Sequence, residues 1–127
     1  KGMGVVLQPS GAASLLRLLA ICRKAGIPPE RIWVDCLAKP FVLGKAVNRP
    51  VLERVSAMRR RGLQSLLALG NVSYGMKNRG RVEADFLRQA TRRGLDACIL
   101  DPLINAPPFS HGAFPRAGAQ SHRSRRG

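Results

Sequence analysis

Apolar residues form four short, continuous runs along the chain. These runs occupy positions 5–8, 32–35, 65–69 and 97–100. Apolar and polar residues do not alternate within these runs, as they would in a strand with one solvent-exposed face. A continuous run of this kind is typical of a parallel strand that is covered on both faces. The pattern therefore predicts four buried, parallel strands.

Between these runs, apolar residues recur with helical spacing. Segments 12–25, 50–61 and 82–93 each place apolar side chains on one stripe of a helix. The stripes consist of Leu15, Leu18, Leu19 and Cys22; of Leu52, Val55 and Met58; and of Val82, Phe86, Leu87 and Ala90. We expect three amphipathic helices, one after each of the first three strands.

The three expected helices end alike, in cations followed by a glycine and an apolar residue. The glycines are Gly26, Gly62 and Gly94. Glycine readily adopts the left-handed conformation that closes a helix, and cations favour the negative end of the helix dipole. Glu83 and Asp85 are expected in the first turn of the third helix, where anions are favourable.

The predicted elements alternate in the order β-α-β-α-β-α-β, in units of about 30 residues. Such alternation predicts an α/β fold whose parallel strands are joined by right-handed crossovers. Two architectures share this order: a small doubly wound sheet and part of a (β/α)8 barrel. Periodicity alone leaves both open.

The composition suits one domain. The chain has 127 residues, 45% of them hydrophobic, and a formal net charge of +15. No apolar run approaches the roughly 18 residues of a membrane span.

The charge invites a nucleic-acid interpretation, but three arginines at 59–61, at a helix end, are typical of a solvated face. Cys22, Cys36 and Cys98 fit neither a disulfide framework nor a zinc ribbon, so we expect reduced thiols in a cytoplasmic protein.

The end of the chain lacks periodicity. From Asn105 onward it is rich in Pro, Gly, Ser and Arg, so we expect a domain over 1–106 and a disordered, basic tail over 107–127. A non-catalytic nucleic-acid-binding module is therefore one alternative. Phe109 and Phe114 are the aromatic residues of this tail, too few to support base stacking, and nucleic acid is not the expected partner.

Ligands of parallel α/β folds bind at the carboxyl ends of the strands. The polar residues at these ends are Gln8, Ser10, Asp35, Asn71, Ser73 and Asp101. Asp35 can also bond to loop N–H groups, and Asp101, before Pro102, can begin a turn. Asn71 lies between apolar residues, so we expect its amide to be partly buried and to need a partner. The two histidines fall in the expected tail, so no metal site is expected.

Several of these residues lie in longer, recognisable stretches. The stretches are GIPPERIWVD (26–35), GNVSYGMKNR (70–79) and GLDACILDPL (94–103). Together they resemble the pterin-binding methyltransferases. This family comprises the methyltetrahydrofolate:corrinoid methyltransferases and the folate-binding domain of cobalamin-dependent methionine synthase. The similarity covers roughly residues 5–103.

The resemblance implies a fold and an activity. The fold is the C-terminal half of a (β/α)8 barrel, and the activity is methyl transfer from 5-methyltetrahydrofolate to the cobalt of a corrinoid (cobalamin-binding) protein. Asn71 would be catalytic and hydrogen-bond near N5 of the folate, and Asp35 would bind the pterin ring. The other residues that match the substrate-binding motifs are Ser73, Gly75, Arg79 and Asp101. The resemblance also implies a homodimer.

The family's pocket also uses an Asp and an Asn from earlier strands, and this sequence does not contain those strands. We therefore expect the chain on its own to bind folate weakly and to have little activity. Two alternatives stay open. One is a dihydropteroate-synthase-like pterin enzyme, although its Ser-Arg-Lys signature is missing from the matching strand. The other is a doubly wound domain with an unrelated small ligand.

Overall fold

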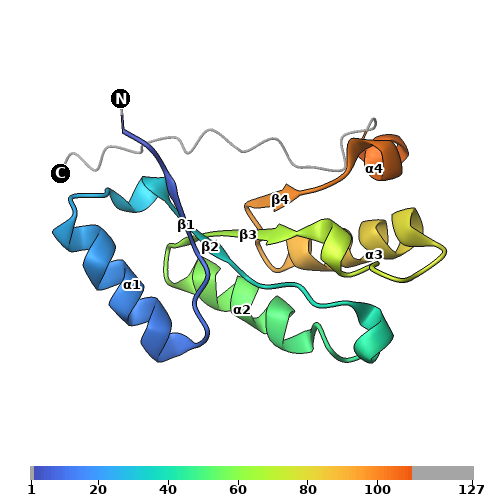
Figure 1. The fold of residues 1–127 in the computed structure, drawn as a ribbon, viewed down its shortest axis with the longest axis horizontal. Helices are drawn as coiled ribbons and strands as arrows, with labels where there is room; N and C mark the ends of the chain where they lie inside the picture. Colours follow the sequence, from blue (N-terminus) through green and yellow to red (C-terminus); the bar gives the residue numbers. More distant parts are fainter. Residues whose placement is uncertain (1, 110–127) are drawn as a thin grey trace, which may run out of the picture.

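The computed structural model describes residues 2–109, which form strands, helices and short 3-10 turns (Figure 1). The strands are β1 (Val5–Leu7), β2 (Ile32–Asp35), β3 (Gln64–Ala68) and β4 (Ala97–Ile99). The helices are α1 (Ala12–Lys24), α2 (Arg49–Arg60), α3 (Arg79–Arg92) and α4 (Pro102–Phe109). The turns are η1 (Pro29–Arg31), η2 (Phe41–Leu43) and η3 (Leu69–Asn71).

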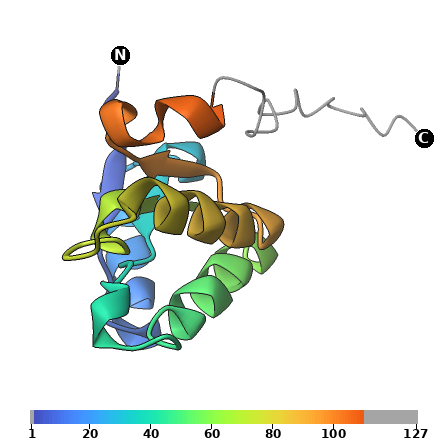
Figure 2. The same ribbon diagram turned by 90° about the vertical axis from the view of Figure 1, so that its right-hand side faces the viewer.

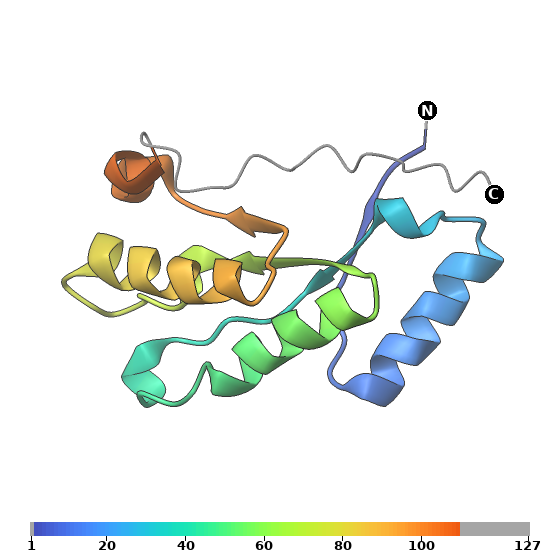
Figure 3. The ribbon, with the colours of Figure 1, turned by 180° about the vertical axis from the view of Figure 1, so that it is seen from behind.

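The strands form one sheet in the order β1-β2-β3-β4, and every pair is parallel. This arrangement confirms the predicted parallel βαβ units. A doubly wound sheet reverses its strand order at a switch point, and no reversal occurs among these four strands. In Figure 3, α1, α2 and α3 lie side by side in the same order as the strands that they connect.

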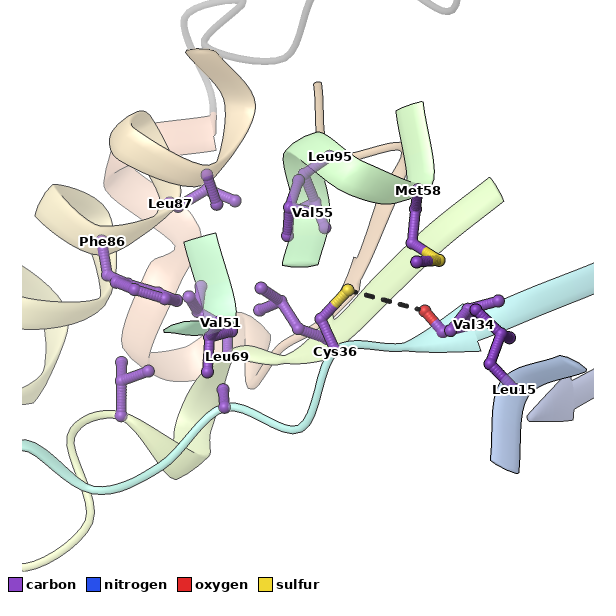
Figure 4. Packing of buried hydrophobic residues seen from close by; sticks show 14 residues of the cluster. Leu15, Val34, Cys36, Val51, Val55, Met58, Leu69, Phe86, Leu87 and Leu95 are labelled. Carbon is purple, nitrogen blue, oxygen red and sulfur yellow. Dashed lines mark hydrogen bonds between the residues drawn. The ribbon is translucent and has the colours of Figure 1, made fainter. Parts of the chain in front are cut away.

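One face of the sheet packs against these three helices. Paired residues of neighbouring parallel strands point to the same side, and Val34 pairs with both Leu7 and Ser65. On this side Val34 and Leu67 are fully buried. They meet one helical cluster (Figure 4), which includes Leu15 of α1, Val51, Val55 and Met58 of α2, and Phe86, Leu87 and Ala90 of α3. Burial of each large apolar side chain contributes about 1.5–3 kcal/mol to folding.

The opposite face of the sheet, called the open face below, is less well covered. It carries Val6, Trp33, Asp35, Gln64, Leu66, Ala68, Ala97 and Ile99. Asp35 and Leu66 near its centre are buried, but Val6 of β1 and Ile99 of β4 are 54% and 65% exposed. The prediction that all four strands are covered on both faces is therefore wrong for the two edge strands.

The predicted glycine helix ends are confirmed. Gly26, Gly62 and Gly94 have φ angles of +70°, +67° and +92°. The apolar residue after each glycine donates its N–H to a carbonyl in the last turn of the helix, as Leu63 does to Met58 at 3.0 Å. This is the hydrogen bond of a Schellman cap.

The third helix starts earlier than predicted. It begins at Arg79 rather than at 82, because residues 79–81 carry no apolar residue that periodicity could detect. Its first turn therefore contains no acidic residue. Glu83 lies in the second turn and is fully buried. The predicted role of Glu83 at the helix N-terminus is wrong.

The sequence pattern did not predict α4. Asp101 accepts the N–H of Leu103 at 2.9 Å, and Pro102 opens the helix, where its missing N–H is not needed. In Figure 2, α4 lies above β4 and α3. Because α4 ends at Phe109, the expected tail 107–127 overlaps it at 107–109. The rest of that expected tail, residues 110–127 with His111 and His122, lies outside the described residues.

Candidate functional site

Asp35 is the last residue of β2 and lies on the open face at the carboxyl edge of the sheet. It is 8% exposed. Its Oδ1 accepts the backbone N–H of Leu37 at 2.8 Å, and its Oδ2 accepts the side-chain amide of Gln8 at 3.0 Å. Each carboxylate oxygen can accept a further hydrogen bond. Asp35 is thus a fixed acceptor that joins the ends of two neighbouring strands.

The loop that follows Asp35 is held rigidly. Asn48 is buried, accepts the N–H of Lys39 at 2.8 Å and donates to its carbonyl at 2.7 Å. Arg54 of α2 donates to the carbonyl of Cys36 at 3.0 Å. Phe41 donates its N–H to Val72 at 3.0 Å, which ties this loop to the loop after β3. These bonds hold the ends of β2 and β3 in a defined relation.

Asn71 ends the η3 turn after β3 and is exposed. Its side-chain amide has no hydrogen-bond partner within residues 2–109. The prediction of a partly buried amide is therefore wrong. The 3-10 turn returns Leu69 and Val72 to the core, where both are fully buried, and leaves Asn71 at the rim. A free amide at a strand end can both donate to and accept from a ligand.

Ser73 and Arg79 both contact the carboxylate of a residue that was not predicted for the site, Glu83. Ser73 is fully buried and its hydroxyl donates to Glu83 Oε1. Arg79 donates from Nε to Ser73 Oγ at 3.0 Å, and its Nη2 lies 3.5 Å from Glu83 Oε1. Asn105 of α4 donates to Glu83 Oε2 at 2.6 Å. The four side chains form a buried polar cluster, called the Glu83 cluster below.

Sequence reasoning missed the Glu83 cluster, although a signal was present. Glu83 precedes Phe86, Leu87 and Ala90 at the i, i+3, i+4 and i+7 spacing of the buried stripe. An acidic residue on such a stripe needs buried partners, because an isolated buried charge is costly. The helical spacing therefore predicts that Glu83 is buried, but it does not predict which side chains hydrogen-bond to it.

The last two predicted site residues have backbone roles in this structure. Gly75 has a φ of +78°, which only glycine adopts readily, in the turn before α3. Asp101 is exposed and caps α4 through Leu103. Of the six residues, the fold thus brings Asp35 and Asn71 to the ends of neighbouring strands. It uses Ser73, Gly75, Arg79 and Asp101 to hold the surrounding loops.

The three cysteines are free thiols, as expected. Burial raises the pKa of Cys36 to about 11; the charge of Asp35 adds to this, and Arg54 opposes it. Burial also raises the pKa of Cys98. Both thiols are therefore protonated at neutral pH and are poor nucleophiles. Within residues 2–109, no group of three His, Cys, Asp or Glu side chains is placed to hold a metal ion.

Surface hollows occur between the helices. One of about 490 Å³ lies beside the C-terminal half of α1, one of about 370 Å³ between α1 and α2, and one of about 450 Å³ between α2 and α3. Their walls do not include Asp35 or Asn71. Asp35, which is buried, and Asn71, which is exposed, supply a carboxylate and an amide to this rim of the sheet. Both groups can hydrogen-bond a planar ligand.

Among residues 2–109, no helix combines the length and the apolar composition of a membrane-spanning segment. No protein-family model matches the chain.

Proposed function

We propose that this chain carries half of a pterin site, whose parent activity transfers the methyl group of 5-methyltetrahydrofolate to the cobalt of a corrinoid protein. The observation that carries this proposal is the placement of Asp35 and Asn71. Asp35 is the last residue of β2, and Asn71 is the last residue of the η3 turn that follows the neighbouring strand β3. Both also lie in the stretches that resemble the pterin-binding methyltransferases.

The strand order supports a half-barrel architecture. Four parallel strands in sequential order, with α1–α3 on one face, correspond to four consecutive units of a (β/α)8 barrel. Active sites of such barrels lie at the carboxyl ends of the strands. The open face corresponds to the barrel interior, and the candidate site lies at its carboxyl edge.

Asp35 suits the edge of a pterin ring. The pterin presents its 2-amino group and a ring N–H side by side, and both are donors. A carboxylate accepts both in charge-assisted hydrogen bonds. Gln8 and the N–H of Leu37 fix the orientation of the carboxylate before the ligand arrives. Such pre-organisation lowers the entropy cost of binding.

Asn71 suits the reacting nitrogen. Breaking the N5–methyl bond leaves an electron pair on N5, and a tertiary amine is a poor leaving group unless N5 takes up a proton from solvent. The Asn71 amide oxygen can accept a hydrogen bond from that protonated N5. This interaction strengthens as N5 becomes cationic, so it favours the transition state over the ground state. The corrinoid partner supplies the nucleophilic cobalt.

The Glu83 cluster would position this amide without touching the ligand. Ser73 is buried two residues after Asn71, and its bond to Glu83 attaches the loop to α3. Arg79 adds a second attachment to the same carboxylate. We therefore assign Ser73 and Arg79 as positioning residues.

The proposal is tested by titrating 5-methyltetrahydrofolate into the isotope-labelled chain and following its amide NMR signals, which detects weak binding. We expect saturable shifts at Gln8, Asp35–Leu37 and Asn71. Asp35→Asn should weaken binding at least tenfold, whereas Gln89→Ala, an exposed amide on α3, should not. If millimolar folate leaves the carboxyl edge unchanged, or if both variants bind like the parent chain, the proposal is wrong.

A further inference from the structure

The sheet has two unpaired edges among the described strands. β1 pairs with β2, β4 pairs with β3, and neither has a second neighbour. An unpaired edge presents a row of backbone N–H and C=O groups that can pair with another strand. The two edges lie on opposite sides of the sheet, and both strands run in the same direction.

The composition of the open face is unusual for a surface of this chain. The chain has 22 Lys and Arg residues, yet none of them lies in the four strands. Val6 and Ile99 are more than half exposed at its margins. Asp35 is its one charged residue, and Gln8 already partners that carboxylate. In a chain with a net charge of +15, strands without cations and with exposed aliphatic side chains at their margins suit a surface that another chain covers.

We propose that a second copy of this chain covers the open face and closes the sheet into an eight-stranded barrel. A twofold axis along the barrel axis places β4 of each copy beside β1 of its partner. Rotation about this axis does not change strand direction, so both new pairs are parallel. The open faces then turn inward and the helices outward, as in a (β/α)8 barrel. This inference rests on the half-barrel architecture of the proposed function.

The two edges favour a second copy over other occupants. A single added strand or peptide pairs with one edge and leaves the other free. A second copy offers β1 to β4 and β4 to β1 at the same time, so both edges are paired. The contact is closed under twofold symmetry and stops at a dimer. The absence of cations from the strands means that closure brings no Lys or Arg into the barrel from them.

The same closure would complete the candidate site. Asp35 and Asn71 border one side of the barrel mouth, and the strand ends of the partner would border the other. A folate bound at this edge would then be enclosed by both copies. A monomer offers a ligand only the single rim described above.

The test compares two isoleucines of nearly equal exposure. Ile99 on the open face is 65% exposed, and Ile21 on α1 is 62% exposed. We expect the parent chain to sediment as a dimer of twice 13.8 kDa. Ile99→Lys should shift it to a monomer, because it places a cation inside the barrel. Ile21→Lys should remain a dimer, and circular dichroism should show the same helical content in both variants.

Hydrogen exchange at the strand edges gives a second measurement. Backbone amides of β1 and β4 should become more protected as the protein concentration rises, and Ile99→Lys should abolish that dependence. A monomeric parent chain, or a dimer that both lysine variants leave intact, overturns the inference. These results are independent of folate. A dimer without folate binding refutes the proposed function alone, and a monomer that binds folate refutes the closure alone.

Discussion

The amide of Asn105 donates a hydrogen bond of 2.6 Å to the buried carboxylate of Glu83, 22 residues earlier in the chain. This bond joins α4 to α3. Glu83 also accepts from Ser73, so three segments meet at one carboxylate. Ser73 lies two residues after Asn71, so this connection anchors the loop that carries the exposed amide.

Removing this carboxylate should destabilise the fold. Glu83→Ala leaves the Ser73 hydroxyl, the Arg79 guanidinium and the Asn105 amide without their shared acceptor. Breaking a buried charged pair costs about 3–5 kcal/mol. The Glu83–Arg79 pair is partly screened, because Arg79 is 41% exposed, so we expect a loss of about 2–3 kcal/mol in urea unfolding. Glu53→Ala, on an exposed position of α2, should change the free energy of unfolding by less than about 0.5 kcal/mol. Equal effects of the two substitutions would contradict the role of the cluster.

Substitution of Asn71 should separate catalysis from binding. The Asn71 amide makes no hydrogen bond within residues 2–109. Asn71→Ala should therefore leave the free energy of unfolding nearly unchanged. If the amide acts on the developing charge at N5, single-turnover methyl transfer to cob(I)alamin by a complete barrel that contains this chain's segment should slow by about 100-fold or more. Folate affinity should fall much less. Equal losses of rate and affinity would indicate uniform binding instead of transition-state stabilisation.

Stability should fall in alkaline solution through Cys36. Burial raises the pKa of this thiol from 9.0 to about 11, so between pH 9 and 11 the unfolded chain loses a proton that the folded chain keeps. The unfolded state is then favoured, and the free energy of unfolding falls by up to about 1.4 kcal/mol per pH unit. Below pH 9 this contribution is constant. Cys36→Ala should flatten the curve of unfolding free energy against pH in that window. Cys22→Ala, at another buried cysteine, controls for loss of a sulfur atom. The prediction is refuted if the unfolding free energy of the parent chain changes with pH as little as that of Cys36→Ala.

Two glycines separate backbone strain from crowding. A Cβ added at Gly62 or at Gly11 meets no atom within 4 Å, but Gly62 has a φ of +67° and Gly11 a φ of 176°. Gly62→Ala should therefore destabilise the protein by about 1–2 kcal/mol in thermal or urea unfolding. Gly11→Ala adopts an extended backbone without strain, so it should destabilise the protein clearly less than Gly62→Ala, although Gly11 is the N-cap of α1, where alanine is disfavoured. A Gly62→Ala variant as stable as the parent chain would contradict this prediction and show that α2 can end without a left-handed residue at position 62.

The parallel order of strands and helices, the amphipathic stripes and the glycine helix ends could all be predicted from the sequence. These features depend on local quantities, namely periodicity and the conformational range of glycine, which a single chain displays directly. The same patterns identify Asp35 and Asn71 as candidates for ligand binding, because the carboxyl ends of parallel strands can be located in the sequence.

The three-dimensional packing of the elements determines which of these polar residues face solvent and which bind other parts of the protein. Ser73 and Arg79 bind Glu83, a partner from another element, and the pairing depends on how α3 packs behind the loop. Asn71 is exposed because η3 turns it outward while its neighbours return to the core. The sequential sheet, its open face and its two free edges likewise depend on long-range pairing. Local periodicity cannot determine such pairing, because strands in either architecture have the same apolar pattern.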